Sequence, residues 1–121
     1  MRSDDRLLVC RNEDGAIVGI FSLSQIFYGP FCNAYLGYYA FVPFAGQGYM
    51  REGIRLVLRH AFDALDLHRL QANIQPGNMS SIALVRGAGF TKEGLSRRYL
   101  MIAGAWQDHE QWTLLVEDRA L

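Results

Sequence analysis

A glycine-rich turn joins a strand-like segment to a helix-like one near the middle of the chain. The stretch YYAFVPFAGQGYMREG is aromatic and β-prone up to Pro43, and it carries Gly46 and Gly48 just before helical spacing begins. Unpaired N–H groups and the positive end of the helix dipole would meet at this point, which suits a phosphate group. Glycine would let a ligand oxygen approach the backbone closely. Taken alone, so short a motif is better explained as a tight turn.

A second polar cluster, Asn78-Met79-Ser80-Ser81, stands at the start of another helix-like segment. Asn and Ser are typical helix N-caps, and capping is the ordinary explanation of this pattern. The alternative is that the Asn78 amide and the Ser81 hydroxyl bind a ligand, and both roles can hold at once. Whether either motif does chemistry depends on the elements that position it.

The turn residues and the apolar spacing predict those elements. Strands are expected at Arg6–Cys10, Ala16–Phe27, Ala34–Val42 and Arg69–Ile74, with two more around the turn at Ala103 and Gly104. Helices are expected from Tyr49 to Leu65 and from Ser80 to Phe90. The order β-β-β-α-β-α-β-β implies an α/β (or α+β) fold with a mixed central β-sheet flanked by helices. Its strand–helix–strand unit from Ala34 to Ile74 should be a right-handed parallel crossover.

Composition and charge narrow the partners. The 121 residues, 50% of them hydrophobic, suffice for a single domain, expected to span residues 1–121. Twelve basic residues balance 12 acidic ones, so the charge gives no reason to expect nucleic acid or a membrane as partner. Cys10 and Cys32 form no disulfide framework and have no metal-ligand spacing. With no leader in MRSDDR and no apolar run long enough for a bilayer, a cytoplasmic protein is expected.

Three segments taken together resemble the GNAT acetyltransferases, and in particular the ribosomal-protein N-terminal acetyltransferase (RimJ/RimL) group. They are VPFAGQGYMREGI, HRLQANIQPGNMSSIALVRGAGFTKEG and YLMIAGAWQDH, in the family's order, and the resemblance extends from about Val18 to Leu115. It implies a GNAT-like fold, acetyl-CoA as co-substrate and no metal. It also implies a peptide or protein N-terminus, such as that of a ribosomal protein, as the acetyl acceptor.

The resemblance assigns the glycine turn to the pyrophosphate of acetyl-CoA, which backbone amides would bind. The residues of this turn are Ala45, Gly46, Gln47, Gly48, Tyr49, Met50 and Arg51. The family pattern begins with Gln or Arg and ends with Gly or Ala, so Ala45 and Met50 depart from it. The lost first side chain is expected to weaken the contact with phosphate, whereas Met50 still offers its amide.

The same resemblance assigns the remaining site residues. Phe41 and Val42 would lie on the strand whose backbone pairs with the pantetheine arm. Asn78 would hydrogen-bond a pantetheine amide, and Ser81 would lie near the thioester sulfur and help the thiolate to leave. Tyr38 and Tyr39 are the expected substrate-binding residues.

A general base is harder to identify. Some relatives carry a glutamate on the strand after the Gly89-Phe90 motif, and Leu100 stands near that place here. The remaining candidates are Glu52, Glu93, Tyr38 and Tyr39, each with an ordinary structural explanation. The three histidines, His60, His68 and His109, are expected to be surface or structural residues. A site without a base must take the amine as water leaves it, which favours an α-amine over a lysine.

Relatives usually carry another N-terminal strand and a helix pair that form part of the acceptor site, and the chain is expected to lack them. This leaves open a natural short form, an acceptor side completed by another subunit as in a homodimer, or a truncated reading frame. Three other functions also stay open: acetylation of a small amine or an antibiotic, a non-catalytic acyl-CoA-binding module, and a purely structural domain.

Overall fold

The computed structural model describes residues 4–41 and 48–119. In chain order its elements are β1 (Asp4–Cys10), β2 (Ile17–Phe27), β3 (Asn33–Ala40), α1 (Tyr49–Arg59), β4 (Arg69–Ile74), α2 (Met79–Gly87), β5 (Thr91–Ile102) and β6 (Ala105–Leu115). A π-helical turn at His60–Ala64 prolongs α1, and a short 3-10 turn at Val116–Asp118 follows β6. The predicted order of strands and helices is confirmed.

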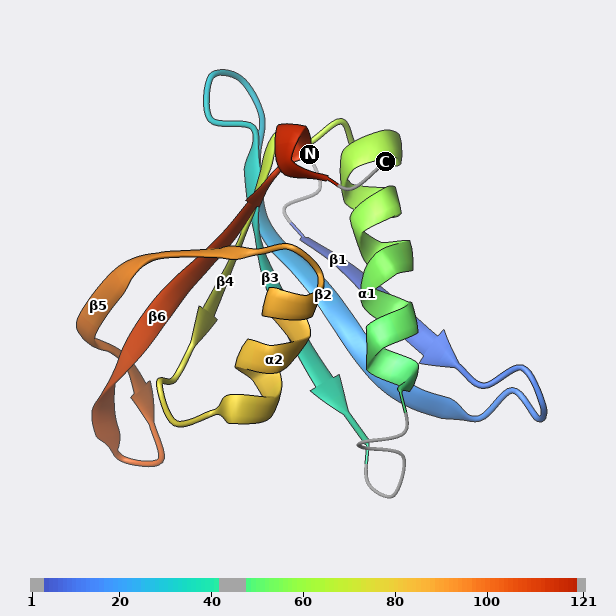
Figure 1. Cartoon of the computed structure of the whole chain (residues 1–121), viewed down its shortest axis with the longest axis horizontal. Coiled ribbons are helices and arrows are strands. Elements are labelled where there is room, and N and C mark those ends of the chain that lie inside the picture. The colour runs from blue at the N-terminus through green and yellow to red at the C-terminus, as the bar shows by residue number, and fades with distance from the viewer. Residues whose placement is uncertain (1–3, 42–47, 120–121) are drawn as a thin grey trace.

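The strands form one six-stranded sheet in the order β1-β2-β3-β4-β6-β5 (Figure 1). Only β3 and β4 run parallel, while every other neighbouring pair is antiparallel. The parallel pair results from the connection through α1, which returns the chain to the same end of the sheet. The mixed sheet and the parallel crossover are therefore confirmed. None of the described helices has the length and apolar composition needed to cross a bilayer.

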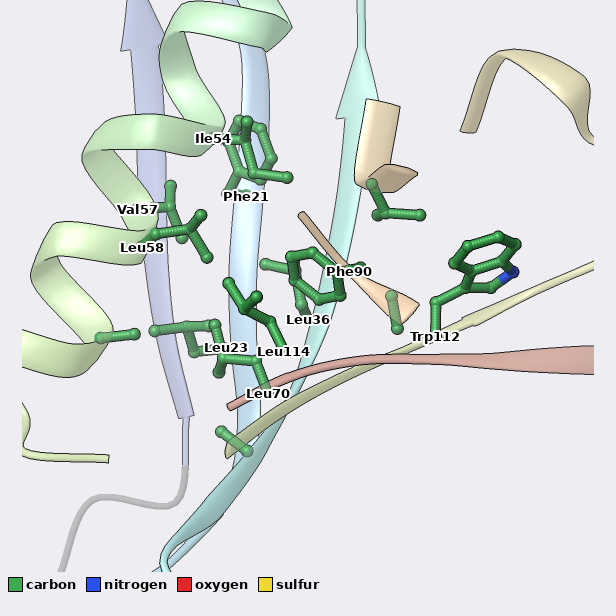
Figure 2. Packing of buried hydrophobic residues seen from close by; sticks show 14 of the residues in the cluster. Phe21, Leu23, Leu36, Ile54, Val57, Leu58, Leu70, Phe90, Trp112 and Leu114 are labelled. Atoms are coloured by element: carbon green, nitrogen blue, oxygen red, sulfur yellow. The ribbon is translucent and has the colours of Figure 1, made fainter. Parts of the chain in front are cut away.

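Both helices pack on the same face of the sheet (Figure 1). The apolar spacing of α1 produces this packing, since Ile54, Val57 and Leu58 are buried while Arg51 and Arg55 on its other side are exposed. Figure 2 shows these apolar side chains pointing toward Phe21 and Leu23 of the sheet. We call this covered side the helix face, and the other side the open face.

The parallel strands β3 and β4 pair over only three residues. Asn33, Ala34 and Tyr35 oppose Arg69, Leu70 and Gln71, and beyond this point β3 runs on to Ala40 without a partner in β4. Over its whole length β4 pairs instead with β6, on its other side. The two parallel strands therefore diverge toward their carboxyl ends.

A partly buried arginine, Arg69, joins the strands at the closed end of this divergence. Arg69 Nη1 donates to Asn33 Oδ1 at 2.8 Å and to Gln71 Oε1 at 3.0 Å, and its Nη2 donates to Glu93 Oε1 at 2.8 Å. Asn33 is fully buried. Because the fork of one guanidinium joins β3, β4 and β5 here, the strands are held together up to the residue at which their pairing stops.

Gly53 allows α1 to lie close to the sheet. A Cβ at this position would stand 2.9 Å from both Phe21 Cε2 and Val9 Cγ2, which is closer than carbon atoms pack. The absence of a side chain at Gly53 thus sets the distance between α1 and the strands β1 and β2.

We therefore expect Gly53→Val to destabilise the fold by about 1–3 kcal/mol, the usual cost of forcing extra volume into a packed core. Urea denaturation measures this loss. Gly87→Val is the matched control, because Gly87 is also helical but a Cβ there would meet nothing within 4 Å. An equal loss in the two variants would show that close packing under α1 is not the cause.

Candidate functional site

A cleft of about 370 Å³ opens where β3 and β4 diverge. It is lined by Leu36, Gly37 and Tyr38 of β3, by Ala72, Asn73 and Ile74 of β4, by Gln75, Asn78 and Ser81 near the start of α2, and by His109 of β6. The strand ends and the start of α2 thus meet here, because the last three residues of β4 pair with β6 but not with β3.

Residues of both faces of the sheet line the cleft. Leu36 and Ala72 belong to the buried cluster under the helices, so their side of the cleft is the helix face. Asn73 lies directly opposite Gln111, and Gln111 Nε2 donates to Ser96 Oγ at 2.7 Å. Since Ser96 pairs with His109, these four side chains share the open face. Ligands could therefore approach the same point from both sides.

On the helix face, Ser81 and Tyr38 form a close pair. Ser81 Oγ donates to Tyr38 Oη at 2.8 Å, and Tyr38 Oη donates to the Ser81 carbonyl oxygen at 3.2 Å. Burial raises the pKa of the Tyr38 phenol above its usual value, and the hydrogen bond from Ser81 only partly offsets this. Tyr38 therefore stays protonated at neutral pH and can donate a hydrogen bond.

Asn78 caps helix α2. Its Oδ1 accepts from the Ser81 backbone N–H at 3.3 Å and from Ser80 Oγ at 3.2 Å. The Ser81 hydroxyl takes no part in the cap, because it is bonded to Tyr38. The two explanations of the cluster thus separate: Asn78 has the capping role, and the Ser81 side chain points into the cleft.

The described part of the glycine turn begins at Gly48. It is the N-cap of α1 with a φ of +84°, and a Cβ there would meet no atom within 4 Å. Tyr49, Met50 and Arg51 form the first turn of α1, where backbone N–H groups point along the helix axis toward a possible ligand. The remaining predicted residues of this region, Val42, Ala45, Gly46 and Gln47, lie outside the described residues.

The backbone of Phe41 faces away from the cleft. Its N–H donates to the Val18 carbonyl oxygen at 2.9 Å and so continues the pairing with β2. Because successive residues of a strand present their backbone groups to opposite edges, Tyr38 and Ala40 present theirs to the open edge. A ligand arm that pairs with β3 would therefore use those two residues, and Phe41 can contribute only its ring.

A second cavity, of about 350 Å³, adjoins the cleft. It is lined by Arg6, Ile20, Ser22, Tyr38, Tyr39 and Phe41. The register places Arg6 opposite Ser22 and Ile20 opposite Tyr39, so this cavity belongs to the open face. The rings of Tyr39 and Phe41 lie 5.5 Å apart, and Tyr39 is 62% exposed. Tyr38 lines both this cavity and the cleft, so the two spaces are neighbours.

Neither of the two carboxylates that were candidates for a base lines the cleft. Glu93 is bonded to Arg69, and hydrogen bonds from Thr113 and Arg69 hold its pKa below the usual value. Glu52 is exposed in the first turn of α1 and does not line the cleft. Leu100, in the place of the relatives' glutamate, is half-exposed on β5.

Two of the histidines have structural partners. His60 Nε2 lies 3.0 Å from Asp5 Oδ2, and His68 Nε2 lies 2.8 Å from Glu117 Oε1. His109 differs, because it is only 4% exposed and lines the cleft. Of the two expected positions for His109, surface or structural, the buried ring excludes the surface one. Its alternation with Gln111 and Thr113 along β6 is the sequence signal that places it on the open face. The described residues contain no group of His, Cys, Asp and Glu side chains that could hold a metal ion.

Comparison with known proteins relates this geometry to one family. The family model described as "Acetyltransferase (GNAT) domain" matches residues 2–91. The chain is 39% identical over 105 residues to a Bacillus subtilis protein named as a probable N-acetyltransferase, YjcK. It is 34% identical over 106 residues to the [ribosomal protein uS5]-alanine N-acetyltransferase of Escherichia coli.

The matches cover most of this chain but only part of each relative. They include 87% and 88% of the chain, which spans 58% and 55% of YjcK and of the E. coli enzyme. The solved structure of Mycobacterium smegmatis RimJ in complex with CoA-disulfide is 35% identical and superposes with a TM-score of 0.83. That match covers 86% of this chain and 50% of the RimJ chain.

We expect Gly48→Val to abolish CoA binding while leaving the fold intact, because the side chain would occupy the space beside the first amides of α1. Isothermal titration with CoA measures the affinity. Gly104→Val is the matched control, since Gly104 has the same φ of +84° and the same open surroundings but lies in the hairpin between β5 and β6. Equal CoA affinities in the two variants would contradict a ligand role for the turn.

Proposed function

Because this chain belongs to the GNAT acetyltransferase family, we propose that it transfers the acetyl group of acetyl-CoA to the N-terminal α-amine of a protein. The observation that carries the proposal is the pair of Ser81 and Tyr38 in the cleft between the diverging strands. We take residues 1–121 as a single catalytic domain. The 34% identity to an enzyme named for ribosomal protein uS5 supports a ribosomal protein as the acceptor.

Acetyl-CoA would bind along the helix face. The first amides of α1, at Tyr49, Met50 and Arg51, would bind the pyrophosphate together with Gly48 and the predicted turn residues Ala45, Gly46 and Gln47. The pantetheine arm would lie in the cleft against the open edge of β3, where Tyr38 and Ala40 offer backbone groups. Asn78 borders the cleft, and its side-chain amide nitrogen can donate to a pantetheine carbonyl while its oxygen caps α2.

The acetyl transfer needs donors on two atoms of the thioester. An N–H of the open β3 edge is suited to the carbonyl oxygen, on which negative charge develops. The Ser81 hydroxyl is suited to the departing sulfur. Once it turns its proton from Tyr38 to the sulfur, the protonated Tyr38 phenol can donate to Ser81 Oγ, which reverses their present hydrogen bond. A bound acetyl-CoA supplies the activated acyl group, and no covalent acyl-enzyme is required.

The acceptor would enter from the open face. The cavity beside the cleft offers apolar surface from Ile20, Tyr39 and Phe41, with Arg6 at its edge. An extended peptide end with its first side chain against these rings would present its α-amine to the cleft. Tyr39 would thus contact the acceptor directly, while Tyr38, on the helix face, would act from behind the thioester.

Ser81→Ala should lower kcat by about 10²-fold with little change in CoA affinity, because the variant loses the donor to sulfur. Stability should be unchanged, since the cap of α2 uses the Ser81 backbone N–H and not its hydroxyl. Thiol release with a peptide acceptor gives kcat. Ser80→Ala is the control, because Ser80 is exposed and bonds only Asn78. Unchanged kcat in Ser81→Ala would remove Ser81 from the mechanism.

The acceptor class is tested with two peptides, one with a free N-terminus and one N-blocked with an internal lysine. At pH 7.5 roughly a third of α-amines are neutral, against about 0.1% of lysine side chains. We expect kcat/KM to favour the free N-terminus by about two orders of magnitude on this ground. Equal values for the two peptides would exclude a preference for α-amines, and a small amine that surpasses both would favour a small-molecule acceptor.

A further inference from the structure

We propose that His109 is the general base that takes the proton of the attacking amine, an inference that rests on the proposed acetyl transfer. Among the residues that line the cleft, none carries a carboxylate, an ammonium or a guanidinium group. His109 is the member of this set whose side-chain type changes its charge near neutral pH. His109 can therefore serve as the base for the amine in a cleft whose lining residues include no glutamate.

His109 lies on the side from which the amine would come. It shares the open face with Asn73 and Gln111, whereas Ser81 and Tyr38 act from the helix face. The leaving sulfur and the incoming nitrogen must occupy opposite sides of the thioester carbonyl. The sheet provides this separation, since its two faces carry the donor to sulfur and the acceptor for the amine proton.

The ring of His109 is held in the tautomer that a base requires. Nδ1 lies 3.0 Å from the Gln107 carbonyl oxygen, which can only accept, so Nδ1 carries the proton. Nε2 then keeps its lone pair in the neutral ring. No hydrogen bond to Nε2 is found among the described residues, which leaves this nitrogen for a ligand.

A bulge in β5 places an aromatic wall against the ring. The pairing of β5 with β6 shifts between Ser96 and Leu100, where Arg98 has a φ of +47°. Asp108 Oδ1 accepts from the Arg98 backbone N–H at 2.8 Å and so holds the bulge. Tyr99, the next residue, presents its ring edge to His109 with centroids 6.1 Å apart. Bulges commonly re-aim side chains beside active sites in this way.

The charged and titratable groups around His109 leave its ring unpaired. On β6, Asp108 is bound to Arg98 and Glu110 accepts from Trp112 Nε1 and Lys92 on the helix face. On β5, Tyr99 contacts the ring, and the side chains of Arg97 and Arg98 belong to exposed residues. On β3, Tyr38 lines the same cleft. Thus no carboxylate of these elements forms an ion pair with His109.

The proposed acetyl transfer forms one bond and breaks one. The amine nitrogen forms a bond to the thioester carbonyl carbon, and the carbon–sulfur bond breaks with its electron pair on sulfur. His109 Nε2 takes one proton from the nitrogen and returns it to solvent. The sulfur takes a proton through the Ser81 hydroxyl, so that in sum one proton moves from nitrogen to sulfur.

His109→Asn tests this role, because an asparagine N–H can replace Nδ1–H toward Gln107 but cannot accept the proton. We expect kcat/KM with a free-N-terminus peptide to fall by about 10²–10⁴-fold above pH 8. The ratio of wild-type to variant kcat/KM cancels the ionisation of the amine. It should decline toward one as the pH falls, because a protonated base can no longer accept the proton of the amine.

Two control measurements accompany this test. CoA affinity by titration should equal that of the wild type, and His68→Asn, at an exposed histidine bonded to Glu117, should give a ratio near one at every pH. An active wild type with a ratio that is constant across pH would overturn the role of His109 and leave the acetyl transfer standing. A wild type that binds no CoA and acetylates neither peptide would overturn the proposed function and the base together.

Discussion

The rest of this structure depends on the unequal pairing of β4 with its two neighbouring strands. A central strand has two edges, and β4 uses one of them fully with β6 but the other over only three residues with β3. Unpaired backbone groups inside a protein are costly unless a ligand or water satisfies them. The open edge of β3 is therefore both a weakness of the sheet and a place for a substrate to complete it. Arg69 limits the divergence to one end by joining the strands at the first residues of their pairing.

The two faces of the sheet divide the proposed chemistry. The helix face has the starts of α1 and α2, with the first amides of α1, a capped turn and the Ser81–Tyr38 pair. The open face has His109 and the cavity formed with Tyr39 and Phe41. Direct acetyl transfer requires that the amine reach the thioester carbonyl carbon by a path that acetyl-CoA does not occupy. A cleft lined from both faces meets this requirement with few polar residues, because each of them contacts only one of the two substrates.

Local pattern was sufficient for most of the fold. The spacing of Ile54, Val57 and Leu58 predicts the buried side of α1, and the glycines after Val85 predict the end of α2. The element order and the parallel crossover follow from the same patterns and are confirmed. Ser81 and Asn78 were found as a motif at a helix start, because capping and ligand binding at such a position use the same residue types. These features are local, so the amino-acid sequence by itself determined them.

Only the tertiary structure decided which side chains meet. Ser81 and Tyr38 are separated by 43 positions, and their hydrogen bond exists because α2 packs on the helix face beside the place where β3 and β4 diverge. Sequence alone indicated no base, since His109 stands in a strand pattern like any other. The pairing of β6 with β4 and β5 buries its ring, and this pairing joins distant segments, whereas the bond of Nδ1 to Gln107 is local. The alternation of residues along a strand thus determines toward which face of the sheet a side chain points. The role of that side chain depends on which other strands and helices end beside it.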